Sequence, residues 1–332
     1  MKTITKSILL VLTCFLFMNA NTWAGASKER IKASGNYITK EVKVDAFSGI
    51  HLIGSLDVIY SQSTNGKTTV EIYGSDNIVE YVDTSVRNGI LTVKLKDEVD
   101  ISYGKNGRLD ILVSSPTLEN TTLSGSGDIV LNTRLTTNDL VIKLSGSGDV
   151  IAKHDIHSKN SFIAELHGSG DIELKGKVTA PSSKLAINGS GDIVATSLNS
   201  AREGVIQLNG SGDIEVKKEY KAQELEIKLN GSGDIKVAGI QSASVEASLN
   251  GSGDMDLSGN TQTANLFVEN SGSLNCKKLI SQQVEATVRG SGDIKCHAEK
   301  HLKTSVTGSG EIGYKGNPTV ESSTKEKNVR RL

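Results

Sequence analysis

The chain has 332 residues, of which 37 are basic and 38 are acidic, so its formal net charge is −1. This balance argues against nucleic acid or another polyanion as a partner, because such partners are held by an excess of Lys and Arg. Only 4% of the residues are aromatic, whereas 34 are glycine and 3 are proline, a composition that suits strands joined by tight bends.

Residues 1–26 have the features of a signal peptide. Lys2 and Lys6 precede an apolar run at residues 8–18 that is too short to span a bilayer, and small residues at 24–26 suit cleavage. We therefore expect an exported protein in the periplasm, on the outer-membrane surface or outside the cell, with no transmembrane segment after cleavage. Lipidation at Cys14 is the disfavoured alternative, because this residue lies inside the apolar run.

Residues 27–120 are expected to form irregular β turns that cap the repeats that follow. Gly-Ser-Leu-Asp-Val from Gly54 and Gly-Ser-Asp-Asn-Ile from Gly74 look like two eroded copies of the bend motif described next. Alternating runs at 69–73, 90–95 and 109–113 indicate strands. The first turns of a stack must cover its open edge, which explains why this segment departs from the repeat.

The motif Gly-Ser-Gly-Asp recurs about every 20 residues through residues 121–320. An altered copy, Asn-Ser-Gly-Ser, begins at Asn270. Self-similarity at this period is the signature of a stacked repeat. The other copies begin at Gly125, Gly146, Gly168, Gly189, Gly210, Gly231, Gly251, Gly290 and Gly308, the last with Glu in place of Asp.

Apolar and polar residues alternate on both sides of each Gly-Ser-Gly-Asp motif, which we call a corner. With the first glycine as position 0, position −2 is always aliphatic and position +4 is always apolar, as in Leu208 and Ile214. Period-two alternation predicts strands with one buried face. By the same alternation, both glycines should face inward, where the bend leaves no room for a side chain.

The predicted fold is all-β, a single-stranded parallel β-helix (β-solenoid) with about 20 residues per turn and Gly-Ser-Gly-Asp corners. Stacking the same strand of successive turns about 4.8 Å apart completes the hydrogen bonding and builds a continuous core. An antiparallel β-sandwich is the competing fold, but it does not require one corner motif repeated in phase. Residues 321–332 are charged and lack alternation, so we expect a flexible tail there.

A resemblance to a known family rests on the corner series together with three motifs upstream of it. These are Phe47-Ser48-Gly49-Ile50, Asp57-Val58 and Asn88-Gly89-Ile90-Leu91. In this combination, from about residue 44 to residue 312, the chain resembles the putative auto-transporter adhesin family with the head GIN domain, an exported family common in Bacteroidetes. The resemblance implies a β-solenoid in the envelope or at the cell surface, and adhesion as the family's label.

Position +3 carries a row of carboxylates. In-register stacking would place like charges one turn apart, which is repulsive unless they are neutralised. Two explanations stay open: bound calcium, or hydrogen bonds from the amides of each Asp's own corner in an Asx-type turn. The second is favoured because Ser273 replaces Asp in one copy, so no firm metal site and no cofactor is expected. The row consists of Asp128, Asp149, Asp171, Asp192, Asp213, Asp234, Asp254 and Asp293.

Two further polar rows are expected to be structural. Position +1 is serine in every copy, whereas a nucleophile is needed only once, so no catalytic residue is assigned. Position −1 is asparagine in four consecutive copies, and stacked amides of this kind can hydrogen-bond from turn to turn. These residues are Asn188, Asn209, Asn230 and Asn250.

Cys276 and Cys296 share position +6 on adjacent turns, so both should point into the core within disulfide range. Export permits oxidation, but directly stacked cysteines in parallel strands need a local shift to bond, so a disulfide and two stacked thiols both stay open. Four histidines in the connections belong to no strong metal-ligand pattern and are expected at the surface: His154, His157, His297 and His301.

Together these features favour a non-enzymatic, exported binding scaffold for glycans, matrix proteins or envelope proteins. Exposed odd positions and variable connections such as residues 153–160 and 198–203 would carry specificity, although no ligand-binding residue can be named. The scarcity of aromatic residues weakens the glycan version. The first alternative is a structural envelope scaffold that self-assembles through its ends. A polysaccharide lyase or hydrolase is less favoured, because the acids follow the repeat instead of forming one isolated cluster.

Overall fold

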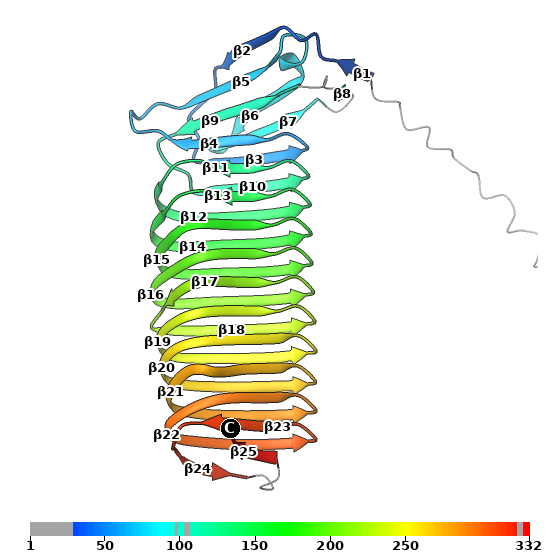
Figure 1. Cartoon of the computed structure of the whole chain (residues 1–332). Coiled ribbons are helices and arrows are strands. Elements are labelled where there is room, and N and C mark those ends of the chain that lie inside the picture. The colour runs from blue at the N-terminus through cyan, green and yellow to red at the C-terminus, as the bar shows by residue number, and fades with distance from the viewer. Residues whose placement is uncertain (1–28, 97–98, 103–106, 324–327) are drawn as a thin grey trace, which may run out of the picture.

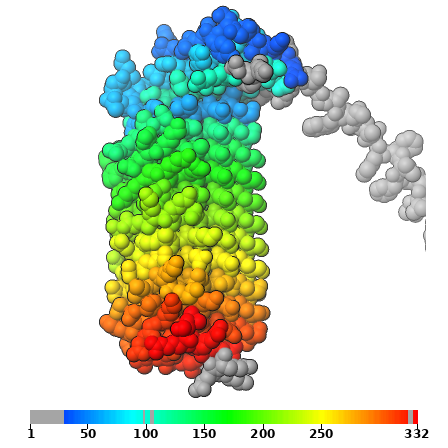
Figure 2. Space-filling model, in the orientation of Figure 1, coloured from blue at the N-terminus to red at the C-terminus, as the bar shows by residue number. Residues whose placement is uncertain are grey.

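The computed structural model describes residues 29–96, 99–102, 107–323 and 328–332. The proposed signal peptide and Cys14 lie outside these residues. Figure 1 shows one column of stacked strands in which the order along the axis follows the order in the sequence from β10 to β23. Figure 2 shows the same column as a body of nearly constant width below a broader N-terminal part.

The column is a parallel β-solenoid of about 10 turns with roughly 21 residues per turn, as the repeat predicts. Each turn pairs in parallel with the next, and corner aligns with corner, as in Gly189 with Gly210 and Gly210 with Gly231. The strands of the regular turns are β10 (Asn120–Gly125), β11 (Ile129–Leu131), β12 (Leu135–Gly146), β13 (Val150–Ala152), β14 (Ile156–Gly168), β15 (Ile172–Gly189), β16 (Ile193–Gly210), β17 (Ile214–Lys221), β18 (Glu224–Gly231), β19 (Ile235–Gly251), β20 (Asp254–Asn270), β21 (Ser273–Gly290), β22 (Asp293–Gly308) and β23 (Glu311–Lys315).

A single hydrophobic core runs the length of the column. The turn that contains β16 shows its origin, since Ile193, Ile206 and Leu208 are fully buried while Gln207 and Asn209, which alternate with them, point outward. Burying one face of every strand supplies the main driving force, and the turn-to-turn hydrogen bonds satisfy the backbone. The column is therefore a rigid support for whatever its outer face carries.

The corner glycines are needed for a reason that differs in part from the one expected. Gly212, the second glycine of its corner, is buried, and a Cβ there would overlap the carbonyl oxygen of Gly191 in the preceding turn. Gly210, the first glycine, is only half-buried, has φ of +145° and would overlap the carbonyl oxygen of Gly189. The obstacle is thus the backbone of the neighbouring turn, because successive Gly-Ser-Gly-Asp corners stack too closely to leave room for a Cβ.

The N-terminal segment starts the stack and also covers it. The first turn consists of β3 (Gly49–Gly54) and β4 (Val58–Gln62), and Gly54 pairs with Gly125, so this eroded corner is a true corner. Above it, β7 (Ile90–Leu95) pairs in parallel with β3, and β9 (Asp110–Ser115) with β4. The remaining elements of this part are β1 (Glu29–Lys32), β2 (Tyr37–Val42), β5 (Thr69–Ser75), the short 3-10 helix η1 (Val79–Tyr81), β6 (Val82–Arg87) and β8 (Val99–Ser102).

The second eroded corner, at Gly74, is not a corner of the stack. Gly74 and Ser75 end β5, which runs antiparallel to both β2 and β9. A Cβ on Gly74 would meet the side chains of Leu109 and Val79, so here glycine makes room for packing between elements. Antiparallel pairing at this end gives the open edge of the first turns a partner.

At the opposite end, part of the segment expected to be a flexible tail forms strands. β24 (Thr319–Ser322) pairs in parallel with β22, and β25 (Val329–Arg331) pairs in parallel with β23. Leu332 follows β25 and packs its side chain over Gly313. These short strands continue the stack by a partial turn (Figure 1).

Candidate functional site: the corner ladders and the outer face

The carboxylates at position +3 form a ladder that joins successive turns. The backbone N–H of Asp149 donates to Asp128 Oδ1 at 2.9 Å, and that of Asp171 donates to Asp149 Oδ1 at 2.9 Å. The same bond recurs from Asp57, in the first turn, to the amide of Asp254. The carboxylates from Asp57 to Asp234 therefore accept from the following turn, and the own-corner Asx turn expected from the sequence is wrong.

The geometry of the bend explains why a carboxylate is needed there. The carbonyl of Gly125 accepts two amides of the next corner, those of Ser147 at 2.9 Å and Gly148 at 3.2 Å, and the carbonyl of Asp149 accepts the amide of Ile129. The amide of the Asp itself is left to the side chain. In the altered corner a backbone carbonyl replaces the carboxylate as acceptor: the amide of Ser273 donates to the carbonyl oxygen of Gly253 at 3.3 Å. The row thus completes backbone hydrogen bonding at the corner.

Burial and stacked charge together shift the pKa of two of these residues. Partial burial, followed by the neighbouring carboxylates, raises the pKa of Asp128 and of Asp171 above its ordinary value, and the hydrogen bond from the next amide only partly offsets the rise. Within the described residues, no group of three or more His, Cys, Asp or Glu side chains is arranged to hold a metal ion. Calcium binding by the row, the disfavoured alternative, stays open to test.

The asparagine ladder expected from the sequence is confirmed for three of its four residues, Asn188, Asn209 and Asn230. Asn209 donates its side-chain N–H to Asn188 Oδ1 at 2.9 Å, and Asn230 donates likewise to Asn209. Asn270, which takes the place of the first glycine in the altered corner, adopts φ of +79° and donates to Asn250 Oδ1 at 2.7 Å. Asparagine can replace glycine here because it tolerates the left-handed region better than most residues.

The two cysteines are free, buried thiols, so the structure has the stacked-thiol arrangement. Burial raises the pKa of Cys296 to about 12 and raises that of Cys276 well above its usual range, which keeps both protonated and unreactive. The histidines do not assemble into a cluster. His154 and His157 are exposed, and His297 Nε2 lies 2.9 Å from Glu299 Oε1.

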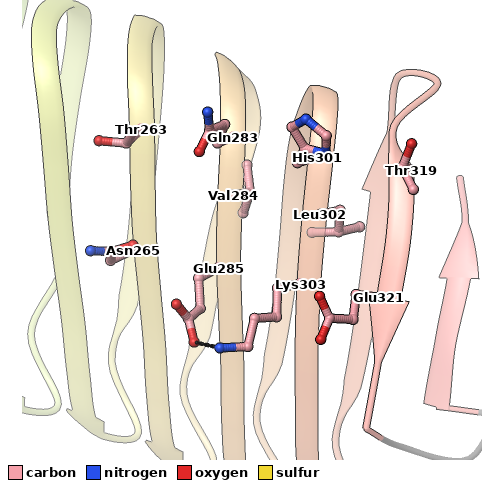
Figure 3. A pocket seen from close by; sticks show the side chains of 10 residues that line it. All are labelled: Thr263, Asn265, Gln283, Val284, Glu285, His301, Leu302, Lys303, Thr319 and Glu321. Carbon is pink, nitrogen blue, oxygen red and sulfur yellow. Dashed lines mark hydrogen bonds and ion pairs between the residues drawn. The ribbon is translucent and has the colours of Figure 1, made fainter.

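The surface that stands out is the outer face of the strand segments that lead into the corners. Odd positions from −7 to −1 point outward here and align across turns, as in Thr263, Gln283, His301 and Thr319. A groove on this face, which we call the C-terminal groove, lies over β20, β21, β22 and β24 (Figure 3). Its outward-pointing residues are Thr263, Asn265, Gln283, Glu285, His301, Lys303, Thr319 and Glu321.

Charge in the C-terminal groove is arranged in one row. Glu285 pairs in register with Lys303, which pairs with Glu321, and Lys303 Nζ lies 2.9 Å from Glu285 Oε1 (Figure 3). The hydrogen bond and charge of Glu285 raise the pKa of Lys303. Both partners are more than half exposed, at 60% and 53%, so this pair adds little to stability and its groups are accessible to a ligand.

A second hollow, the Phe267 groove, continues the first along the stack. It is lined by Glu246, Ser248, Asn265, Phe267, Glu285 and Thr287 and shares Asn265 and Glu285 with the C-terminal groove. Phe267 is half-buried, and the Arg289 guanidinium lies 5.3 Å from its ring centroid. The sequence did carry a signal for this site, because Phe267 stands where neighbouring turns have Ser248 and Thr287.

The face formed by positions +5 and +7 is mainly basic, whereas acidic side chains prevail in the two grooves described above. A hollow there is lined by Asp256, Asn275, Lys277, Lys278 and Lys315. Asn275 donates to Asp256 Oδ1 at 2.5 Å, and the three lysines outnumber this single carboxylate. Neither of the connections expected to carry specificity, residues 153–160 and 198–203, contributes to any of these grooves.

Comparison with solved structures finds similar proteins in Bacteroides and Parabacteroides species. The chain is 25% identical to a putative adhesin from Bacteroides fragilis, over 91% of this chain and 95% of that one, with a TM-score of 0.34. It is 21% identical to a putative adhesin from Parabacteroides distasonis, over 92% and 100%, with a TM-score of 0.46. A putative lipid binding protein from the same species is 23% identical over 92% and 100%, with a TM-score of 0.41. At these TM-scores the likenesses say nothing about a ligand of this chain.

No curated protein matches the chain. Nor do the described residues include a helix with the length and hydropathy that a membrane span requires. The family model described as "Putative auto-transporter adhesin, head GIN domain" matches residues 46–216 and 200–318, which together cover most of the solenoid. The resemblance seen in the sequence is thereby confirmed, and the chain belongs to this family of head GIN domain proteins.

Proposed function

We propose that this protein is an exported, non-enzymatic adhesin that presents the outer face of its solenoid to glycans, matrix proteins or neighbouring envelope proteins. The observation that carries the proposal is that the repeating residues and the varying residues have different roles. Those that repeat, such as Asp171 and Asn209, are used in ladders that hold the turns together. Those that vary, such as Phe267 and Lys303, line contiguous grooves on one exposed face.

The membership in an adhesin family supports the same function. Rigid scaffolds with variable exposed side chains are the usual basis of binding surfaces, because little ordering entropy is lost on association. Location at the cell surface or in the periplasm follows from the same proposal and from the signal-peptide features of residues 1–26.

Catalysis is disfavoured by the exposure of the groove's acids. A glycosidase needs one carboxyl group whose pKa is raised by burial, so that it can donate a proton near neutral pH. Glu285 is instead 53% exposed and engaged with Lys303, and Glu321 is exposed as well. Incubation with uronate-containing and neutral polysaccharides should therefore release no new reducing ends, and their release would identify a lyase or hydrolase.

The experiment that tests adhesion is binding of the purified protein to an array of glycans and matrix proteins, with calcium and with chelator. Saturable binding to one class supports the proposal. A blank array together with a size that grows with concentration would instead favour a self-assembling envelope scaffold. The observation that favours this alternative is β24, which pairs only with β22 among the described strands and so leaves one edge open.

A further inference from the structure

Phe267 breaks the repeat at an outward position. It pairs in register with Ser248 on one side and Thr287 on the other, so it is an aromatic residue in a polar row. Phe47 and Phe162, the other phenylalanines in the described part of the chain, are buried in the core. Core packing therefore does not account for Phe267, which is half-buried on the outer face.

Polar groups capable of binding hydroxyls surround this ring. A second row lies two residues earlier in each strand, where Glu246, Asn265 and Glu285 are aligned in three successive turns. Aligned residues on adjacent strands lie about 4.8 Å apart, so these groups form a line beside the ring. Carboxylates accept hydrogen bonds and the Asn amide both donates and accepts, and Phe267 with these three residues lines one hollow.

This combination suits a sugar ring. A pyranose has one face of C–H groups, which packs on the negative face of an aromatic ring, and a rim of hydroxyls that need donors and acceptors. The net charge of the site also selects among glycans, because the three carboxylates of Glu246, Glu285 and Glu321 outnumber the two cations, which are Lys303 and the Arg289 beside the ring. Sulfated or uronate-rich chains would be repelled.

We propose, on the basis of the function proposed above, that the Phe267 groove binds a pyranose ring of a neutral glycan. Phe267 is the stacking platform, and Glu246, Asn265 and Glu285 bind the hydroxyls. The C-terminal groove shares Asn265 and Glu285 and leads on from this site, so further sugar units of the same chain lie over Gln283, His301 and Glu321. Arg289 lies over the ring but is exposed, and its weak cation–π contact yields to a ligand.

The test compares wild type with three variants on immobilised neutral oligosaccharides and sulfated oligosaccharides. Phe267→Thr restores the polar character of the row, since Thr287 holds the same position in the next turn, so the fold is kept. Glu285→Gln removes a charge and keeps the shape. Gln207→Ala is the matched control, because Gln207 holds the Phe267 position on a turn that contributes to neither groove.

Wild type is expected to bind neutral oligosaccharides and not sulfated ones. Phe267→Thr should weaken this binding about tenfold or more, since loss of a central aromatic contact removes roughly one factor of ten in affinity. Glu285→Gln should weaken it severalfold, and Gln207→Ala should leave it unchanged. Thermal unfolding of all four proteins confirms that only binding has changed.

Other results separate this inference from the proposed function. If wild type binds a neutral glycan and Phe267→Thr binds it equally well, the site is wrong and adhesion stands. If wild type binds only matrix proteins, envelope proteins or sulfated chains, the ligand class is wrong and adhesion again stands. Binding to no glycan and no protein overturns both proposals.

Discussion

At the scale of single residues, the corner glycines are the positions where the stack tolerates least change. Gly212→Val should abolish folding or lower the free energy of unfolding by several kcal/mol, because the new Cβ would overlap the carbonyl oxygen of Gly191. The matched control is Ser211→Val, which adds the same side chain one residue earlier at an exposed position. Lys217→Ala, also exposed, is a second control with an expected change within about 0.5 kcal/mol.

Circular dichroism during thermal unfolding measures all three variants. Equal melting temperatures for Gly212→Val and Ser211→Val would mean that the backbone of the preceding turn can move aside. The stacking account of the corner glycines would then be wrong.

Among single residues, some hydrogen-bond partners could be predicted from the sequence and others could not. The asparagine ladder could be predicted, because both partners occupy the same position in adjacent turns and an amide can donate and accept at once. The partner of the Asp carboxylate could not, because the own-corner amides and the amide of the next turn are equally plausible from spacing alone. Only the three-dimensional bend shows that the carbonyl of Gly125 already accepts the amides of Ser147 and Gly148, which leaves the amide of Asp149 to a side chain.

At the scale of the element, the carboxylate ladder should make stability depend on pH in an unusual direction. The pKa values of Asp128 and Asp171 are raised in the folded state, so this state binds protons more tightly than the unfolded chain. The stability that these groups contribute is therefore greatest below the unfolded value of 3.8 and falls as the pH rises through the raised values. Lowering the pH from 7 toward 4.5 should slightly raise the melting temperature.

Asp171→Asn provides the control for this prediction. The amide oxygen still accepts the N–H of Asp192, while the charge that repels Asp149 and Asp192 is gone. The variant should melt at or above the wild-type temperature at pH 7 and should gain less on acidification. A wild-type melting temperature that falls steadily between pH 7 and 4.5 would contradict the ladder electrostatics. Below pH 3.8 a fall is expected, because hydrogen bonds lower the pKa of Asp76 and of Asp139.

The elements at the N-terminus show that a local motif does not decide its own pairing. Gly54 and Gly74 open similar five-residue stretches, yet one forms a corner and the other ends an antiparallel strand. The difference arises from which strand each neighbour meets, since strand preferences depend on tertiary context more than on local sequence. The regular turns could be predicted because their corner motif and alternation agree through the whole repeat, whereas a single eroded copy carries no such redundancy.

At the scale of the whole molecule, the variable residues decide the function and the repeat decides the shape. The sequence therefore predicts the solenoid well, from alternation and from the corner period. It predicts the grooves poorly, because these depend on which exposed side chains become neighbours across turns. Glu246, Asn265 and Glu285 are about 20 residues apart in sequence and adjacent in space. Phe267 could have been noticed as the aromatic member of a polar row, because the corner motif sets the register, but the hollow beside it could not.

We also expect that the column does not need calcium for its stability. Its turns are joined by backbone hydrogen bonds and one continuous core, and a carboxylate such as that of Asp149 already accepts an amide from the next turn. The melting temperature in chelator should therefore equal that in calcium. If calcium bound only the folded state, it would raise the melting temperature, and the rise would grow as the calcium concentration exceeded the dissociation constant. A lower melting temperature in chelator, restored by calcium and absent in Asp149→Asn, would assign the row to metal and make its charge functional. Equal temperatures, combined with glycan binding that survives chelation, would place recognition on the outer face and leave the corners to hold that face rigid.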